Sequence, residues 1–142
     1  MTNTLITIKT HLNSSAIPSP PNITRTTAIA DTGTTGNYLM IGSPVTNLSP
    51  TTHSIAVRMP NGSHIKSTHT GLLDLPGLPE AARQAHIFPA LSSGSLLSIG
   101  LLCDHGCEAS FSRHEVRIRR HGRTILTGHR NHHGLWMIDL PT

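Results

Sequence analysis

The stretch Glu115-Val-Arg-Ile-Arg119 alternates charged side chains with β-branched apolar ones, and Thr124-Ile-Leu126 continues the pattern after a short turn. Alternation with a period of two residues is typical of a strand with one buried and one solvated face. Similar short segments lie on either side, at Glu108–Ser112 and at Leu135–Leu140. Turn residues separate these segments, so this part of the chain predicts neighbouring strands rather than helices.

Strand signals continue toward the N-terminus. Pro60-Asn-Gly62 separates His53–Met59 from Ser63–Thr68, a pattern that predicts a β-hairpin with an Asn-Gly turn. Three further short apolar segments are typical of strands: Thr27–Ala30, Gly71–Leu75 and Leu96–Gly100. Helical turns are expected only in two places: Pro79–Gln84 and Leu101–Asp104. The sequence therefore predicts an all-β fold, a small closed β barrel or sandwich, with one or two short helices.

Composition restricts the fold further. The chain has 142 residues, which fits one domain, and its 10 prolines and 12 glycines exclude a coiled coil. Only four aromatic side chains are present, so the core is expected to consist of Leu, Ile, Val and Ala. Residues 1–26 form a Ser/Thr/Pro-rich arm with a short strand-like segment at Thr4–Thr10, and residues 27–142 form the domain. Such an arm is long enough to reach another subunit.

Charge and hydropathy narrow the classes of partner. No run of 18 apolar residues exists, so no membrane partner is expected, and the N-terminus lacks the regions of a signal peptide. The formal net charge is +4, and most of the excess lies between Arg113 and Arg130, with a cluster from Arg117 to Arg123. Because apolar residues alternate with these arginines, a solvated strand face is the better interpretation than a nucleic-acid site.

Other candidate sites are weaker. Cys103 and Cys107 have a spacing that suits no common zinc site, and the 11 histidines are interpreted as solvated turn residues. Neither a metal nor another cofactor is therefore expected. Four Asn-x-Ser/Thr sequons are candidate acceptors for N-glycosylation, although no secretion signal supports their use: Asn13, Asn22, Asn47 and Asn61.

The motif with chemical content is Ala28-Ile-Ala-Asp31-Thr32-Gly33-Thr34, a short apolar strand that leads into an Asp-Thr-Gly turn. Hydrolysis of a peptide by an aspartic dyad needs two carboxylates that share one proton and flank a water molecule. A glycine in the turn allows a close approach of another backbone, and a threonine hydroxyl can lock two such loops together. Alone, a three-residue motif is a weak signal.

A second region strengthens this hypothesis. The run from Ser95 to Phe111, Ser-Leu-Leu-Ser-Ile-Gly-Leu-Leu-Cys-Asp-His-Gly-Cys-Glu-Ala-Ser-Phe, is followed by Glu115-Val-Arg-Ile118. It closely resembles the segment that closes the protease domain of copia-type retrotransposon polyproteins. The Asn61-Gly62 hairpin, Leu75-Pro-Gly-Leu-Pro79 and Gly134–Leu140 are also similar to that family, so the resemblance covers roughly residues 27–140.

The resemblance implies a retropepsin-like aspartic endopeptidase, a small closed β barrel that is active as a homodimer on a polypeptide substrate. It implies that Asp31 is the catalytic acid and base, Thr32 the locking hydroxyl and Gly33 the residue of close approach. Ile99-Gly100 matches the apolar-Gly pair that supports the active-site loop. None of the other aspartates is followed by Thr-Gly or Ser-Gly, so a second copy must supply the second carboxylate. The expected location is the cytoplasm or a virus-like particle.

Two questions stay open at the level of sequence. The resemblance implies a flap over the substrate, and both Ile41–Thr52 and the hairpin tipped by Pro60-Asn-Gly62 are candidates. The second question is the assembly. If a segment such as Leu5–Ile8 adds to a sheet edge of a neighbouring copy without closing, an open polymer forms instead of a dimer. The alternative function is thus a non-catalytic, extracellular, filament-forming protein with the same fold.

Overall fold

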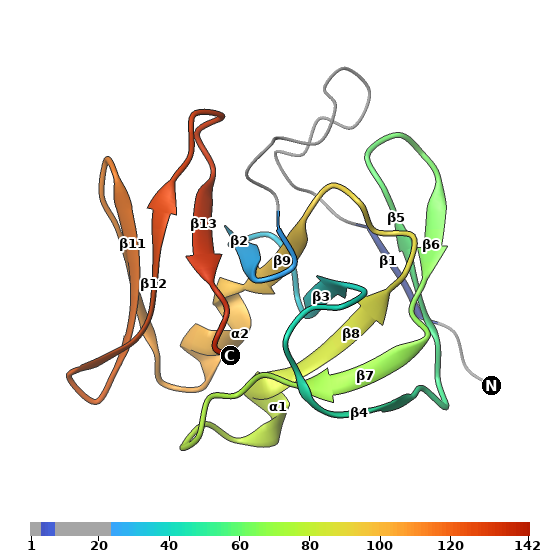
Figure 1. Ribbon diagram of the computed structural model, residues 1–142, viewed down its shortest axis with the longest axis horizontal. Coiled ribbons are helices and arrows are strands. Elements are labelled where there is room, and N and C mark those ends of the chain that lie inside the picture. The colour runs from blue at the N-terminus through green and yellow to red at the C-terminus, as the bar shows by residue number, and fades with distance from the viewer. Residues whose placement is uncertain (1–3, 8–23) are drawn as a thin grey trace.

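The computed structural model describes residues 4–7 and 24–142, and it contains thirteen strands and two short helices in this part of the chain (Figure 1). The helices are α1 (Glu80–Arg83) and α2 (Ile99–Asp104). The strands are β1 (Thr4–Thr7), β2 (Thr27–Asp31), β3 (Asn37–Met40), β4 (Thr46–Pro50), β5 (Ile55–Arg58), β6 (His64–Lys66), β7 (His69–Leu72), β8 (Gln84–Phe88), β9 (Ser95–Ser98), β10 (Glu108–Phe111), β11 (Glu115–Arg120), β12 (Arg123–Arg130) and β13 (Trp136–Asp139).

The strands form two sheets. The larger has ten strands in the order β10-β11-β12-β13-β2-β9-β3-β8-β7-β4, and the smaller has the order β1-β5-β6. In Figure 1, β11–β13 lie on one side and β4, β7 and β8 on the other, with β2 and β9 between them. The prediction of a mostly β fold with two short helices is confirmed. Within the described residues no strand pairing joins β10 to β4, so the predicted closed barrel is not observed as a closed ring.

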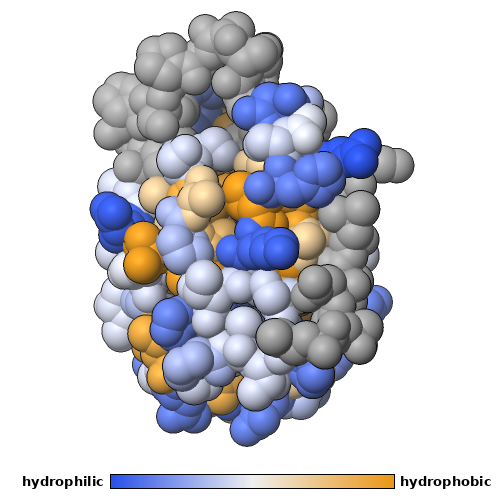
Figure 2. Space-filling model, turned by 90° about the vertical axis from the view of Figure 1, so that its right-hand side faces the viewer, coloured by the Kyte–Doolittle hydropathy of each residue, from blue (hydrophilic) through white to orange (hydrophobic). Residues whose placement is uncertain are grey.

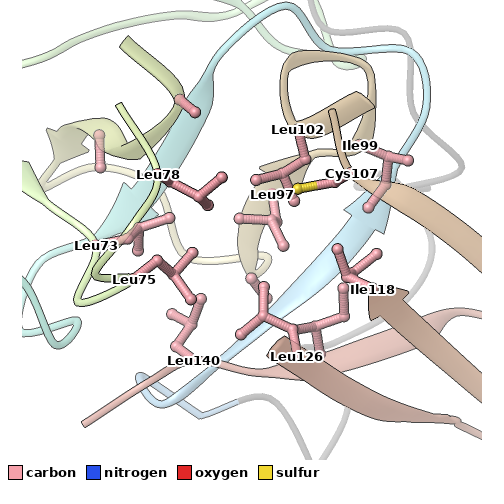
Figure 3. Close-up of a cluster of buried hydrophobic side chains, with 14 of the residues drawn as sticks. Leu73, Leu75, Leu78, Leu97, Ile99, Leu102, Cys107, Ile118, Leu126 and Leu140 are labelled. Atoms are coloured by element: carbon pink, nitrogen blue, oxygen red, sulfur yellow. The ribbon is translucent and has the colours of Figure 1, made fainter. Parts of the chain in front are cut away.

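The main core lies between the two halves of the large sheet. It joins Leu73, Leu75 and Leu78, which follow β7, to Ile118 and Leu126 of β11 and β12 (Figure 3). No aromatic side chain belongs to the buried residues of this cluster, as the composition predicted. A smaller cluster departs from that prediction, because it contains the aromatic pair Tyr38 and Phe88, whose ring centroids lie 5.4 Å apart in an edge-to-face arrangement.

Two predicted strands end elsewhere than expected, for reasons outside the local pattern. The strand expected at Leu96–Gly100 is β9, which ends at Ser98 because Ser98 caps α2 and its Oγ accepts a hydrogen bond from the Leu101 N–H at 3.1 Å. The strand expected at Gly71–Leu75 is β7, which ends at Leu72, and the Leu73 N–H donates to the Arg83 carbonyl instead. Strands β3, β4 and β8 were not predicted at all.

The N-terminal segment forms a strand within its own chain. Residues 4–7 are β1, which runs parallel to β5 with Thr4 opposite Ile55 and Thr7 opposite Arg58. The predicted strand is confirmed at these residues, and its proposed contact with another subunit stays a prediction. Within the chain, β1 completes the three-stranded sheet with the β5–β6 hairpin. Residues 1–3 and 8–23 of the predicted arm, which include the predicted strand residues 8–10, lie outside the described residues.

Candidate active site

Asp31 is the last residue of β2, a central strand between β13 and β9 of the large sheet. It lies opposite Ser98 in the parallel β2–β9 pair. The side chain is buried, with 7% of its surface exposed, and its Oδ1 accepts a hydrogen bond from the Gly33 N–H at 2.7 Å. A carboxylate that accepts a backbone N–H two residues later fixes the turn that follows it. Asp31, Thr32 and Gly33 therefore lie together in one tight turn at the end of a buried strand.

Thr32 and Gly33 are exposed, whereas Thr34 is buried and attached to the neighbouring strand. The hydroxyl of Ser98 donates to the Thr34 carbonyl at 2.8 Å. The same oxygen accepts from the Leu101 N–H, so one buried hydroxyl joins the turn to the first turn of α2. Ser98 is wholly buried, and sequence reasoning did not single it out. We define residues 31–36 as the Asp31 loop.

Asn37 joins the end of the Asp31 loop to two distant segments. Its side chain is completely buried, its Nδ2 donates to the Gln84 carbonyl at 3.0 Å and the Ala82 carbonyl at 3.3 Å, and its Oδ1 accepts from the Ser98 N–H at 2.9 Å. Buried polar groups with all their partners present hold a backbone in one arrangement. A lone asparagine before the apolar run Tyr-Leu-Met is the sequence signal that would have identified it.

The aromatic side chain of Tyr38 lies against the Asp31 loop at Gly36. A Cβ on Gly36 would lie 3.0 Å from Cε1 of Tyr38, so a larger residue at position 36 would require the ring to shift by a few tenths of an ångström. The hydroxyl of Tyr38 hydrogen-bonds to Thr35, and burial raises the pKa of Tyr38 more than this bond lowers it. The ring of His86 lies 6.2 Å from that of Tyr38, and burial lowers the pKa of His86.

The predicted supporting pair, Ile99-Gly100, divides into two different environments. Ile99 is 4% exposed and belongs to the main core, as its predicted packing role requires. Gly100 is exposed, and a Cβ built there would meet no atom within 4 Å. In the described part of this chain, the contact with the Asp31 loop is therefore made by Ser98, one residue before the pair.

The two flap candidates lie in different sheets. Residues 46–50 form β4, the edge strand of the large sheet, and pair with β7. The hairpin predicted at Asn61-Gly62 is confirmed as β5 and β6, and Gly62 has a φ of 87° with open space around it. Figure 2 shows this side of the molecule, where an apolar area is bordered by hydrophilic side chains. The partly buried Ile55 and Ile65 of the hairpin pack against the smaller core cluster.

The remaining aspartates are exposed and belong to other elements. Asp139 of β13 lies opposite Thr27, at the end of β2 remote from Asp31, so about 13 Å of strand separates the two positions. Asp74 follows β7, and Asp104 is the last residue of α2. None of them follows a buried strand next to the Asp31 loop. The described residues thus supply one candidate catalytic carboxylate for each chain.

The other predicted sites show no organised centre. Cys103 is exposed and Cys107 is buried, both are free, and within residues 4–7 and 24–142 no three His, Cys, Asp or Glu side chains are grouped to hold a metal ion. The expected alternation of β11 is confirmed, with Arg117 and Arg119 exposed and Arg117 paired with Glu115 at 3.2 Å.

The surface features are equally plain. Of the sequons, Asn47 and Asn61 are exposed, and Asn13 and Asn22 lie outside the described residues. No helix among the described residues is long and apolar enough to cross a membrane.

Comparison of the chain with protein-family models, with curated proteins and with solved structures finds no match in any of the three. The assignment of a function therefore depends on the residues around Asp31 and on the chemistry that they permit.

Proposed function

We propose that this chain is one subunit of a homodimeric aspartic endopeptidase of the retropepsin type, similar to the proteases of copia-type retrotransposons. The observation that carries the proposal is the setting of Asp31. Its side chain is buried at the end of a central strand, and its Oδ1 accepts a hydrogen bond from the Gly33 N–H at 2.7 Å. A rigid, desolvated carboxylate next to exposed turn residues fits a group that works at a subunit interface.

The second carboxylate comes from a second copy. Two Asp31 side chains across a two-fold axis repel each other as anions, so the pair holds one proton between them. Thr32 and Gly33 are exposed beside Asp31, and the second copy would contact the chain there. In this arrangement the Thr32 hydroxyl bonds to the opposite loop, and Gly33 leaves room for its backbone.

The reaction then follows from the shared proton. The ionised Asp31 accepts a proton from a water molecule, whose oxygen bonds to the carbonyl carbon of the substrate peptide. The protonated Asp31 of the second copy donates its proton to the carbonyl oxygen, which gives a neutral gem-diol. When this intermediate collapses, one carboxylate accepts a hydroxyl proton and the other carboxyl donates a proton to the amide nitrogen. The C–N bond breaks, and the pair again holds one proton.

We assign the flap of this protease to the β5–β6 hairpin rather than to residues 41–52. The hairpin turn is closed by short-range bonds, Gly62 N–H to the Met59 carbonyl at 2.9 Å and Met59 N–H to the Ser63 carbonyl at 2.8 Å. Residues 46–50 are instead paired with β7 in the large sheet, which opposes their movement. The β5–β6 hairpin belongs to a separate small sheet, so its tip can move over a substrate without breaking the sheet that holds Asp31.

The substrate class that fits is a polypeptide in an extended conformation, with a parent polyprotein as the natural target in the cytoplasm or a virus-like particle. The alternative is an open, non-catalytic polymer linked by exchange of the N-terminal strand. The pairing of β1 with β5 of the same chain does not favour this alternative, because the strand has a partner without a neighbouring copy.

The decisive experiment compares Asp31→Asn with Asp139→Asn, a matched change at an exposed aspartate of the same sheet. Cleavage of a denatured, dye-labelled casein is measured at acidic pH, and the assembly is measured by sedimentation. Loss of the catalytic carboxylate is expected to reduce the rate by about 10²–10⁴-fold, with the assembly unchanged. Asp139→Asn is expected to cleave like the unmodified chain. Equal activity in both variants, or an inactive open polymer of the unmodified chain, would overturn the proposal.

A further inference from the structure

A pocket remote from the Asp31 loop lies between the segment that follows β7 and the turn between β11 and β12. Its volume is about 510 Å³, within the range of small-molecule sites. Leu75, Leu78 and Ile125 form apolar parts of the wall, and both leucines also belong to the main core. No residue of the Asp31 loop or of the β5–β6 hairpin lines this pocket.

One rim of the pocket concentrates positive charge. Arg120 and Arg123 both line it and lie directly opposite each other across the β11–β12 pair. His121 and Gly122 form the turn between them, with φ values of 51° and 75°. Like charges at directly opposite strand positions destabilise a hairpin. Among the described residues the one ion pair joins Arg117 to Glu115. Asp74 also lines the pocket, but its carboxylate is not within ion-pair distance of Arg120 or Arg123.

The guanidinium of Arg120 is held in place but keeps an unused donor. Its Nη1 donates to the Gly77 carbonyl at 2.6 Å, which fixes the guanidinium against the segment that follows β7. Its Nε is buried and has no acceptor among the described residues. The buried Nε is out of reach of a pocket ligand, but a guanidinium fixed in this way presents its accessible donors in a geometry that suits a carboxylate or a phosphate.

We propose that this pocket binds a small organic anion, with its phosphate or carboxylate group at Arg120 and Arg123 and its apolar body against Leu75, Leu78 and Ile125. The anion offsets the repulsion of the two opposed arginines that line the pocket. The apolar wall explains why an organic anion is preferred to an inorganic one. The site is separate from the proposed protease chemistry and does not depend on it.

The test is calorimetric titration of the full chain with phenyl phosphate, benzoate, inorganic phosphate and benzyl alcohol. At least one aromatic anion is expected to bind about tenfold or more tightly than inorganic phosphate, with no binding of benzyl alcohol. Which anion binds better distinguishes a phosphate ligand from a carboxylate ligand.

The matched variants are Arg123→Gln, at the exposed pocket arginine, and Arg117→Gln, at the ion-paired arginine of the same hairpin. Arg123→Gln is expected to weaken the aromatic anion about tenfold, and Arg117→Gln to leave its affinity unchanged. Circular dichroism checks that both variants are folded. Equal weakening by both variants, or no aromatic anion preferred over inorganic phosphate, would refute the site. Asp31→Asn is expected to bind the anion normally, which separates this result from the protease assay.

Discussion

The Asp31 loop and the turn of the β5–β6 hairpin are both short polar turns, but different parts of the chain hold them. The Thr34 carbonyl is bonded by Ser98, and Asn37 at the end of the loop is bonded to Gln84 and Ser98, so the partners are 47 to 64 residues apart. The hairpin turn is closed by Met59, Asn61 and Ser63, which are at most four residues apart.

This difference predicts that the Asp31 loop is held more firmly than the turn of the hairpin. Bonds between distant segments break only when the packing of several strands is lost, so the Asp31 loop shares the stability of the whole fold. Bonds within a hairpin turn survive when the hairpin moves as a unit. Peptide hydrolysis requires a preorganised carboxylate, so substitutions at the Asp31 loop are expected to have larger effects than matched substitutions at the hairpin tip.

The largest effect is expected for Asn37→Leu, compared with Asn61→Ala at the hairpin tip. The leucine has a similar size but leaves the buried Ser98 N–H without its acceptor and removes the donor to Gln84. The free energy of unfolding in urea is expected to fall by about 3 kcal/mol. Asn61→Ala, which removes exposed bonds to Ser63, is expected to cost about 0.5 kcal/mol. Similar losses at both positions would remove the distinction between the two turns.

Ser98→Ala is expected to have the next largest effect. The change removes the bond to the Thr34 carbonyl and the cap of α2 together, so a loss of about 2 kcal/mol is expected in urea unfolding. Ser63→Ala, the matched change in the hairpin, is expected to cost about 0.5 kcal/mol. In the casein assay, Ser98→Ala is expected to lower kcat more than it raises KM, because the Asp31 loop, and with it the catalytic carboxylate, loses the bond that positions it. An unchanged kcat would mean that Ser98 stabilises the fold without positioning the site.

Tyr38→Phe tests the contact between Tyr38 and the Asp31 loop. The ring stays in place and only its hydroxyl bond to Thr35 is lost, so a decrease of about 1 kcal/mol in unfolding free energy is expected. Phe88→Leu, in the same small cluster but away from the loop, serves as the control for activity. It is expected to lower stability by a similar amount while kcat is unchanged. If kcat falls equally in Tyr38→Phe and in Phe88→Leu, the Tyr38 hydroxyl has no specific role in activity.

The smallest expected effect is a pH dependence from His86. Burial lowers the pKa of this imidazole in the folded chain below its usual 6.5, so folding disfavours the protonated form. The stability contributed by neutral His86 is fully present above about pH 6.5, where this imidazole is also neutral in the unfolded chain. It is lost as the pH falls through the lower pKa of the folded chain. Unfolding free energies measured from pH 8 to pH 4 should decline less in His86→Gln than in the unmodified chain. His129→Gln, at an exposed position of β12, should keep the original slope.

Those parts of the fold that depend on neighbouring residues could be predicted from the sequence. The alternation from Glu115 to Arg119 predicts β11, and Asn61-Gly62 predicts the hairpin, because turn geometry and strand periodicity act over a few residues. Strand β3 was missed since nearly all its residues are buried, and β8 was missed although Gln84–Ile87 alternates, because this stretch is too short to stand out. Their partners on both sides, rather than their own pattern, make them strands.

The sequence by itself determined a mostly β chain with one Asp-Thr-Gly turn at the end of an apolar strand. Only the tertiary structure decided what holds that turn. Asn37 and Ser98 are ordinary polar residues in the sequence, and they become the supports of the Asp31 loop because β9 folds beside β2 and β3. The tertiary structure likewise places Arg120 and Arg123, which lie opposite each other, beside an apolar pocket wall that the spacing along the chain does not reveal. Hydrogen bonds and pockets join residues that are distant in sequence, so they appear only when the sheet is formed.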